Sequence, residues 1–242
     1  MRVAIDQAFA DAGLAEKDMA RSGALLGLAG ANLIDAQERL ARHLPFAQCA
    51  VASDALTALW GAHGEEDGTI AIVGTGSAFM SRQNGAIRSI GGWGFAVSDL
   101  GSGARLGRDL LEETILAYDG VHQGSALTDA VLQRFGGEAS NLTGFASKAK
   151  PVDFATFAPL VLEHASKNDP VASMLLGLAV SSVDEALDAI LPPDGHALCL
   201  MGGLGQAYQP LLADRHRRLL RAPRGSALDG AVMMAIQRFG AA

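Results

Sequence analysis

Short apolar runs alternate with segments of helical spacing through the first part of the chain. Ile5, Phe9 and Ala12 recur at helical intervals, so the chain is expected to begin inside a helix. Two buried strands and two further helices are predicted after it, at 24–29, 50–52, 32–43 and 55–62. This strand–helix–strand–helix order is typical of a parallel α/β layer.

The pattern changes after a polar, glycine-containing segment, GAHGEEDG at 61–68. Such a break predicts a domain boundary, with one domain at 1–66 and a second at 67–242. The second domain opens with three predicted strands, at 69–73, 77–82 and 86–90. The turn Asn84-Gly85 between the last two is a strong hairpin signal, so these strands are expected to form an antiparallel meander.

The rest of the second domain is predicted to be mostly helical. Helices are expected from 104 to 190, with breaks near Gly120, Gly136-Gly137, Pro151 and Asn168-Asp169-Pro170. One more buried strand is predicted at 197–201, followed by helices at 206–220 and 227–239.

Composition narrows the class of protein. Of the 242 residues 49% are hydrophobic and 19% charged, which excludes a disordered chain. The net charge of −7 argues against nucleic-acid or anionic-membrane binding, although it leaves a phosphorylated ligand open. Cys49 and Cys199 form no motif and fit a reducing compartment, and no apolar run approaches 18 residues. We therefore expect a soluble, cytoplasmic protein with no membrane or nucleic-acid partner.

Three glycine turns follow apolar strands: GTGS at 74–77, GGWG at 91–94 and GGLG at 202–205. Glycine lets the backbone approach a ligand closely and turn its N–H groups toward an anion. One such turn by itself is more often a plain hairpin, but three in one chain favour phosphate binding. None of them is a Walker A loop or a Rossmann fingerprint.

Two aspartates stand at positions where chemistry is plausible. Asp54 ends the second strand, where it serves either as a helix N-cap or as a carboxylate that accepts a proton from a substrate hydroxyl. Asp99 lies between Ser98 and the GSG of 101–103, with a loop cap as the alternative role. The six histidines and two cysteines show no metal-ligand spacing, so no protein-built metal site is expected. The arginines at 215–224 are interpreted as a solvated helix end.

Longer stretches around these turns resemble the BadF/BadG-type ATPase family, which includes N-acetylglucosamine kinase and bacterial glucosamine kinases. The resemblance is carried by GTGS, GGWGFAVSDLGSGARLGR at 91–108, LMGGLGQAYQPLL at 200–212 and ALDGA at 227–231. It implies an α/β fold, the two-lobed actin-like ATPase (ribonuclease H-like) fold. The family's DGGGT-like first phosphate loop has no counterpart here, so the first lobe is expected to be truncated at its N-terminus, with an unpaired strand edge.

The resemblance also implies a role for each candidate residue. Asp54 would be the catalytic base. The sugar would contact Gly91, Gly92, Trp93 and Asp99. ATP would contact Gly74, Thr75, Gly76 and Ser77 through its γ-phosphoryl, and Gly202, Gly203, Gly205 and Ala155 through its adenosine. Phosphoryl transfer with Mg²⁺ needs positioning and charge neutralisation and no covalent nucleophile.

The expected function is therefore ATP-dependent phosphorylation of the 6-hydroxyl of glucosamine or N-acetylglucosamine. The missing first loop, together with Leu100 where relatives usually carry Glu, keeps open a non-catalytic or truncated sugar- or nucleotide-binding relative. A dehydratase-activating ATPase is a further alternative, but it needs closely placed cysteines for an iron–sulfur cluster. The unpaired edge and the resemblance both suggest a homodimer.

Overall fold

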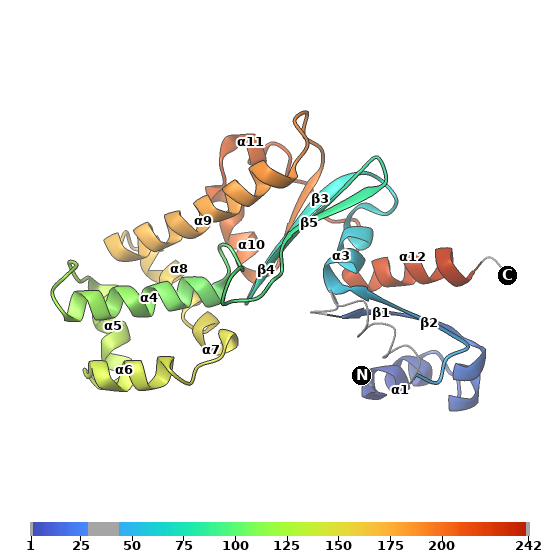
Figure 1. The fold of residues 1–242 in the computed structure, drawn as a ribbon, viewed down its shortest axis with the longest axis horizontal. Helices are drawn as coiled ribbons and strands as arrows, with labels where there is room; N and C mark the ends of the chain where they lie inside the picture. Colours follow the sequence, from blue (N-terminus) through green and yellow to red (C-terminus); the bar gives the residue numbers. More distant parts are fainter. Residues whose placement is uncertain (1, 29–43, 241–242) are drawn as a thin grey trace. The chain divides into compact units, whose positions relative to one another are not determined.

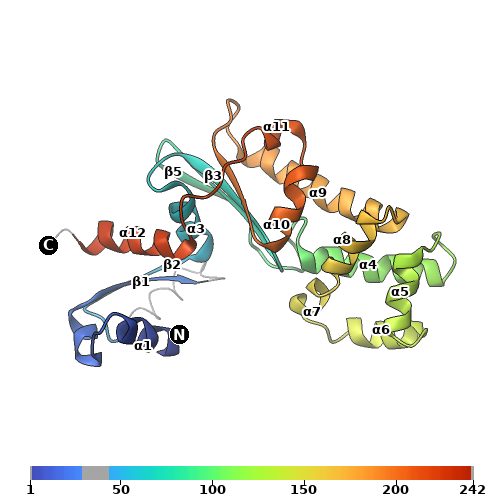
Figure 2. The ribbon, with the colours of Figure 1, turned by 180° about the vertical axis from the view of Figure 1, so that it is seen from behind.

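The computed structural model describes residues 2–28 and 44–240, which form two compact units (Figures 1 and 2). Unit 1 comprises residues 1–66 and 223–242, and unit 2 comprises residues 67–222. The division differs from the expected second domain at 67–242, because the last helix of the chain belongs to unit 1. The helix predicted at 32–43 lies outside the described residues.

Unit 1 pairs two parallel strands with short helices. Its elements are α1 (Arg2–Asp11), η1 (Glu16–Arg21), β1 (Gly23–Leu28), β2 (Gln48–Ser53), α3 (Asp54–His63) and α12 (Ala227–Phe239). Within the described ranges β1 pairs with β2 alone, in parallel register from Gly23↔Gln48 to Leu28↔Ser53. The parallel pair and the helix that follows it confirm the α/β pattern expected from the apolar runs.

Two glycines let α12 lie directly against α3. A Cβ at Gly61 would lie 1.9 Å from the carbonyl oxygen of Ser226, and one at Gly230 would lie 2.0 Å from that of Thr57. Any side chain at either position would therefore push the two helices apart. Arg224 adds an ion pair to Glu66 within the same unit.

Unit 2 is built on a four-stranded sheet in the order β5-β4-β3-β6. The strands are β3 (Gly68–Val73), β4 (Ser77–Gln83), β5 (Ala86–Gly91) and β6 (Leu198–Met201). The first three form the predicted antiparallel meander, and β6 pairs with β3 in parallel. The carboxyl ends of β3 and β6 therefore lie at the same edge of the sheet.

Six helices separate β5 from β6. They are α4 (Gly103–Tyr118), α5 (Ala126–Arg134), α6 (Ala139–Ala146), α7 (Pro151–Ala155), α8 (Ala158–Ser166) and α9 (Pro170–Ile190). Four of the five breaks between them fall where glycine and proline predicted them, whereas the break between α7 and α8 was not predicted. Helices α4, α8 and α9 lie side by side in both views (Figures 1 and 2) and pack with the sheet into one hydrophobic core.

Helix α9 is long and apolar enough to cross a membrane by length and composition, with a mean hydropathy of 1.3. The polar residues within it, such as Ser173, Ser181 and Asp184, keep it from being a continuous apolar run. Val183 and Leu187 of α9 are nevertheless fully buried in the core of unit 2. This core packing accounts for much of the helix's apolar character.

The helix predicted at 206–220 is wrong. The structure has three short pieces instead: α10 (Gly203–Tyr208), η2 (Gln209–Leu211) and α11 (Asp214–Arg217). Pro210 cannot donate a helical hydrogen bond, and the carboxylate of Asp184 caps α11 by accepting from Ala213 N at 3.1 Å. The next residues run alongside β6, because Leu198 N donates to Leu219 O at 2.9 Å.

Candidate functional site

Two of the predicted glycine turns meet at the edge of the sheet where β3 and β6 end. A Cβ at Gly202 would lie 2.3 Å from the carbonyl oxygen of Val73, so the turn after β6 packs directly on the end of β3. Gly202 has φ +87°, which glycine adopts freely. A Cβ at Gly203 would meet nothing within 4 Å. The backbone of the GGLG turn is thus open on one side at Gly203.

The GTGS turn is held by the first residues of α4. Gly103 N donates to Gly74 O at 2.8 Å, and Ala104 N donates to Thr75 O at 3.1 Å. With its carbonyl groups directed at α4, the turn keeps other donors available. The N–H groups of Thr75 and Gly76 and the buried Oγ of Ser77 have no hydrogen-bond partner within the described part of the chain. Such a set of donors suits phosphate oxygens.

Asp99 lies against this turn. A Cβ at Gly76 would lie 3.0 Å from Asp99 Oδ2. Asp99 is only 7% exposed and has φ +63°, a left-handed conformation that is uncommon outside glycine. Its carboxylate accepts no hydrogen bond from the residues that the structure describes. A buried carboxylate in this state is suited to bind hydroxyl hydrogens of a ligand.

The GGWG turn joins the same cluster. Gly92 N donates to Ser77 O at 3.1 Å, and Gly91 pairs with Ala78 across β5 and β4. The side chain of Trp93 is 75% exposed, as a residue that contacts a ligand can be. The turns at 74–77 and 91–94 and the loop at 98–103 therefore converge, with β4 and β5 between the first segment and the other two.

The other segments that are predicted to contact ATP lie around Gly103. A Cβ there would lie 3.2 Å from Gly74 O, 3.3 Å from Leu204 Cδ1 and 3.4 Å from Ala155 Cβ. Gly205 has a different role, since a Cβ at that position would lie 3.3 Å from Leu200 Cγ. Its missing side chain lets α10 pack on β6. Gly103 is part of the GSG at 101–103, to which the sequence assigned no role of its own, although a glycine directly after a capping Ser102 was a usable signal.

Asp54 belongs to unit 1, whereas the other predicted site residues belong to unit 2. The helix cap is supplied by Ser53, whose Oγ accepts from Leu56 N at 3.1 Å. Asp54 is the first residue of α3, lies at the carboxyl end of β2 and is exposed. Its Oδ1 accepts from Ala55 N at 2.8 Å. The capping role is thus filled by a neighbour, which leaves the Asp54 carboxylate accessible to a ligand.

The unpartnered N–H groups and the Ser77 hydroxyl suit an anion, and the Asp99 carboxylate suits the hydroxyl groups of a polyol. Across residues 2–28 and 44–240 no three His, Cys, Asp or Glu side chains form a group that could hold a metal ion. Cys49 is partly buried on β2 of unit 1, and Cys199 is fully buried on β6 of unit 2. Burial raises the pKa of the Cys49 thiol. Leu100, beside Asp99, packs against the hydrophobic core.

Known proteins share this chain's sequence and fold over most of its length. The family described as BadF/BadG/BcrA/BcrD ATPase matches residues 1–232. A glucosamine kinase of Vibrio cholerae serotype O1 is 33% identical over 233 residues, which cover 96% of this chain and 79% of the relative. An N-acetyl-D-glucosamine kinase of Dictyostelium discoideum is 30% identical over 146 residues, covering 57% of this chain and 46% of that protein.

Solved structures agree with the sequence matches. A candidate N-acetylglucosamine kinase from Chromobacterium violaceum superposes with a TM-score of 0.85 at 38% identity, covering 94% of this chain and 80% of its own. A second one, from Porphyromonas gingivalis, has a TM-score of 0.69 at 22% identity over 96% and 83% of the two chains, which shows the fold. The fold is thus the α/β actin-like ATPase fold, and the chain belongs to the BadF/BadG/BcrA/BcrD ATPase family.

Proposed function

We propose that the protein is an ATP-dependent hexosamine kinase that phosphorylates the 6-hydroxyl of glucosamine or N-acetylglucosamine. One observation carries the proposal: the turns at 74–77 and 91–94 and the loop at 98–103 converge on a buried carboxylate, Asp99. Beside it the Oγ of Ser77 and two backbone N–H groups have no partner in the described residues. The similarity to a glucosamine kinase of Vibrio cholerae supports the choice of substrate.

The proposed roles follow from the chemistry of each group. The backbone N–H groups of Thr75 and Gly76 and the hydroxyl of Ser77 hold the γ-phosphoryl group, where charge spreads in the transition state. Asp99, with Gly91, Gly92 and Trp93 beside it, accepts hydrogen bonds from the sugar hydroxyls. The open backbone at Gly202 and Gly203, with Ala155, binds the adenosine end of ATP.

Asp54 acts as the base in this proposal. It orients the 6-hydroxyl of the sugar and takes its proton while the oxygen bonds to the γ-phosphorus. The bond between the γ-phosphorus and the bridging oxygen breaks, and ADP leaves with both electrons of that bond. Mg²⁺ bound to the nucleotide would neutralise part of the phosphate charge, beside the N–H groups of Thr75 and Gly76 and the hydroxyl of Ser77. A cytoplasmic location and small-molecule partners complete the proposal.

A second candidate is a relative that binds the sugar or the nucleotide without turnover. Leu100 favours it, because the resemblance leads us to expect a carboxylate where this side chain packs on the core. The position of the cysteines disfavours a dehydratase-activating ATPase. An iron–sulfur cluster needs accessible, closely placed thiolates, and Cys199 is fully buried on β6.

The test is mass-spectrometric detection of sugar phosphate after incubation of the full chain with Mg-ATP and a panel of hexoses and hexosamines. Phosphorylated glucosamine or N-acetylglucosamine supports the kinase, and ³¹P–¹H NMR of the product identifies the phosphorylated oxygen. Sugar binding by calorimetry without any product favours the non-catalytic candidate. A folded chain that binds neither sugar nor ATP contradicts both.

A further inference from the structure

A buried tyrosine links the helix after the GGLG turn to the loop that carries Asp99. Tyr208, the last residue of α10, donates a hydrogen bond from its Oη to Gly101 O at 2.9 Å, across 107 residues of sequence. Tyr208 is fully buried. Burial raises the pKa of its hydroxyl far above the ordinary value of 10.0, so this group remains a hydrogen-bond donor at any physiological pH.

Gly101 is held from its other side by α9. A Cβ at Gly101 would lie 2.5 Å from Val183 Cγ2 and 2.7 Å from Ala179 O, and its φ is +66°. The glycine thus fits tightly between α9 and the tyrosine. Its carbonyl group is buried, so without the tyrosine hydroxyl that oxygen would lose its hydrogen bond in the interior.

Gly101 and Asp99 belong to the same hydrogen-bonded turn, so a shift of Gly101 moves Asp99 as well. Ser102 N donates to Asp99 O at 3.1 Å, which closes the turn from 99 to 102. Asp99 itself is in the left-handed region at φ +63°, a conformation that a non-glycine residue keeps only when its surroundings impose it. Tyr208 and α9 are the surroundings that fix the far end of this turn.

We propose that Tyr208 is a positioning residue for Asp99: its hydroxyl holds the 99–102 turn so that the Asp99 carboxylate faces the sugar hydroxyls. This inference rests on the proposed function. It makes sugar binding depend on a side chain of the helix that begins at the proposed adenosine turn, although Tyr208 itself touches neither substrate.

The test compares Tyr208→Phe with Thr114→Val. Both remove one buried hydroxyl that donates to a backbone carbonyl in unit 2, and Thr114 bonds to Leu110 O, away from the proposed site. We expect Tyr208→Phe to raise the KM for the sugar about three- to tenfold, as loss of one hydrogen bond allows. The KM for ATP should stay within about twofold, and Thr114→Val should change neither. A sugar KM that moves no more in Tyr208→Phe than in Thr114→Val overturns the inference.

A second readout separates positioning from a general loss of stability. If Tyr208 acts through Asp99, the effect of Tyr208→Phe on the dissociation constant of the sugar should disappear in an Asp99→Asn background. Additive effects of the two substitutions overturn the inference. If the wild-type chain phosphorylates no sugar, the proposed function fails instead. The inference is then tested by measuring the hydrogen exchange of the backbone amides at 99–102. Exchange should be faster in Tyr208→Phe than in Thr114→Val, and equal rates overturn the inference.

A labelled chain that keeps Tyr208 covers the case in which Tyr208→Phe does not fold. The sequence has only two tyrosines, and the other, Tyr118, is 51% exposed. In a 3-fluorotyrosine-labelled Tyr118→Phe chain the single ¹⁹F signal reports on Tyr208. Saturation with the sugar that the wild-type chain binds should shift this signal, and an unchanged signal at saturation overturns the inference.

Discussion

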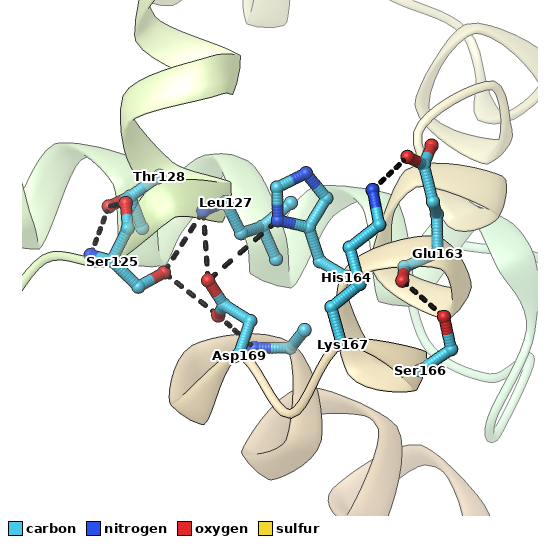
Figure 3. Close-up of polar contacts among 9 residues, drawn as sticks. Ser125, Leu127, Thr128, Glu163, His164, Ser166, Lys167 and Asp169 are labelled. Carbon is cyan, nitrogen blue, oxygen red and sulfur yellow. Dashed lines mark hydrogen bonds and ion pairs between the residues drawn. The ribbon is translucent and has the colours of Figure 1, made fainter.

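The carboxylate of Asp169 accepts a hydrogen bond from the backbone amide of Leu127 at 3.0 Å, across 42 residues of sequence (Figure 3). The same carboxylate accepts from Ala172 N at 3.0 Å and from Ser125 Oγ at 2.9 Å. One side chain therefore caps α5 and α9 together. The group contains a Ser, an Asp and a His, but it is no catalytic triad, because Asp169 lies between the hydroxyl and the His164 ring.

This junction predicts a loss of stability in acid. Burial by itself raises the pKa of Asp169, but hydrogen bonds from Ala172, Leu127 and Ser125 outweigh it, so the pKa lies below the ordinary value of 3.8. Because the pKa of Asp169 is lower in the folded state, its contribution to the free energy of unfolding is complete above the unfolded-state pKa. It is lost as the pH falls through the folded-state pKa. Asp169→Asn should lower the free energy of unfolding by about 1–3 kcal/mol at pH 7.

Urea unfolding measured from pH 7 down to about pH 2 checks this expectation. The difference between wild type and Asp169→Asn should shrink toward the acid end, because the wild-type carboxylate becomes protonated. Asp153→Asn is the matched control, since Asp153 caps only the short helix α7 through Lys150 N. A difference that stays constant over the whole range would contradict the assignment.

Asp54→Asn should abolish most turnover while sugar binding persists. The amide keeps the size of the side chain and removes the base, and general bases contribute about 10²- to 10⁴-fold to rate. We expect kcat to fall by at least about 100-fold with the sugar dissociation constant within about threefold. Steady-state kinetics and calorimetry measure the two quantities. Asp11→Asn is the control, because it changes an exposed carboxylate of the same unit. A near-wild-type kcat in Asp54→Asn would contradict the role of Asp54 as the base.

The two glycines of the GTGS turn should respond differently to alanine. A Cβ at Gly74 would meet nothing within 4 Å, whereas one at Gly76 would lie 3.0 Å from Asp99 Oδ2. Gly74→Ala should therefore leave the melting temperature unchanged and raise the KM for ATP, because the new methyl group occupies phosphate space. Gly76→Ala should raise the KM for the sugar as well, since it displaces the Asp99 carboxylate.

Kinetics with each substrate varied in turn measure both effects. Gly144→Ala is the control, because that glycine lies on α6, outside the proposed site, with no atom within 4 Å of an added Cβ. An unchanged KM for ATP in Gly74→Ala would show that the GTGS turn does not contact the nucleotide. An unchanged KM for the sugar in Gly76→Ala would separate Asp99 from the sugar.

Gly230→Ala should strongly destabilise unit 1. The added methyl group would lie 2.0 Å from Thr57 O, so α12 must move away from α3, and overpacking of this kind costs about 1–3 kcal/mol or more. Gly177→Ala, at a position in α9 where nothing lies within 4 Å, should instead stabilise by up to about 1 kcal/mol. Thermal unfolding compares the two. Equal melting temperatures would contradict the close approach of α3 and α12.

Local patterns were sufficient for most elements of the fold. The meander was predictable because alternating apolar runs and Asn84-Gly85 act within a few residues. Four of the five breaks between α4 and α9 were predictable from glycine and proline, but the one between α7 and α8 was not. The helix at 227–239 was predicted with the bounds that the structure has. The stretch after Gln206 was not, because its apolar spacing looks helical. Its path is decided by Asp184 and by pairing with Leu198, which are distant in sequence.

For the site, the sequence determined which residues are candidates for chemistry, and the tertiary structure decided which of these candidates meet. Glycine turns and aspartates at the ends of strands and in loops are chemical signals that each segment holds by itself. The contact between Gly76 and Asp99, the meeting of Gly74, Leu204 and Ala155 at Gly103, and the bond from Tyr208 to Gly101 all join distant segments. Such contacts depend on how strands and helices pack, and no local pattern of residues encodes that packing.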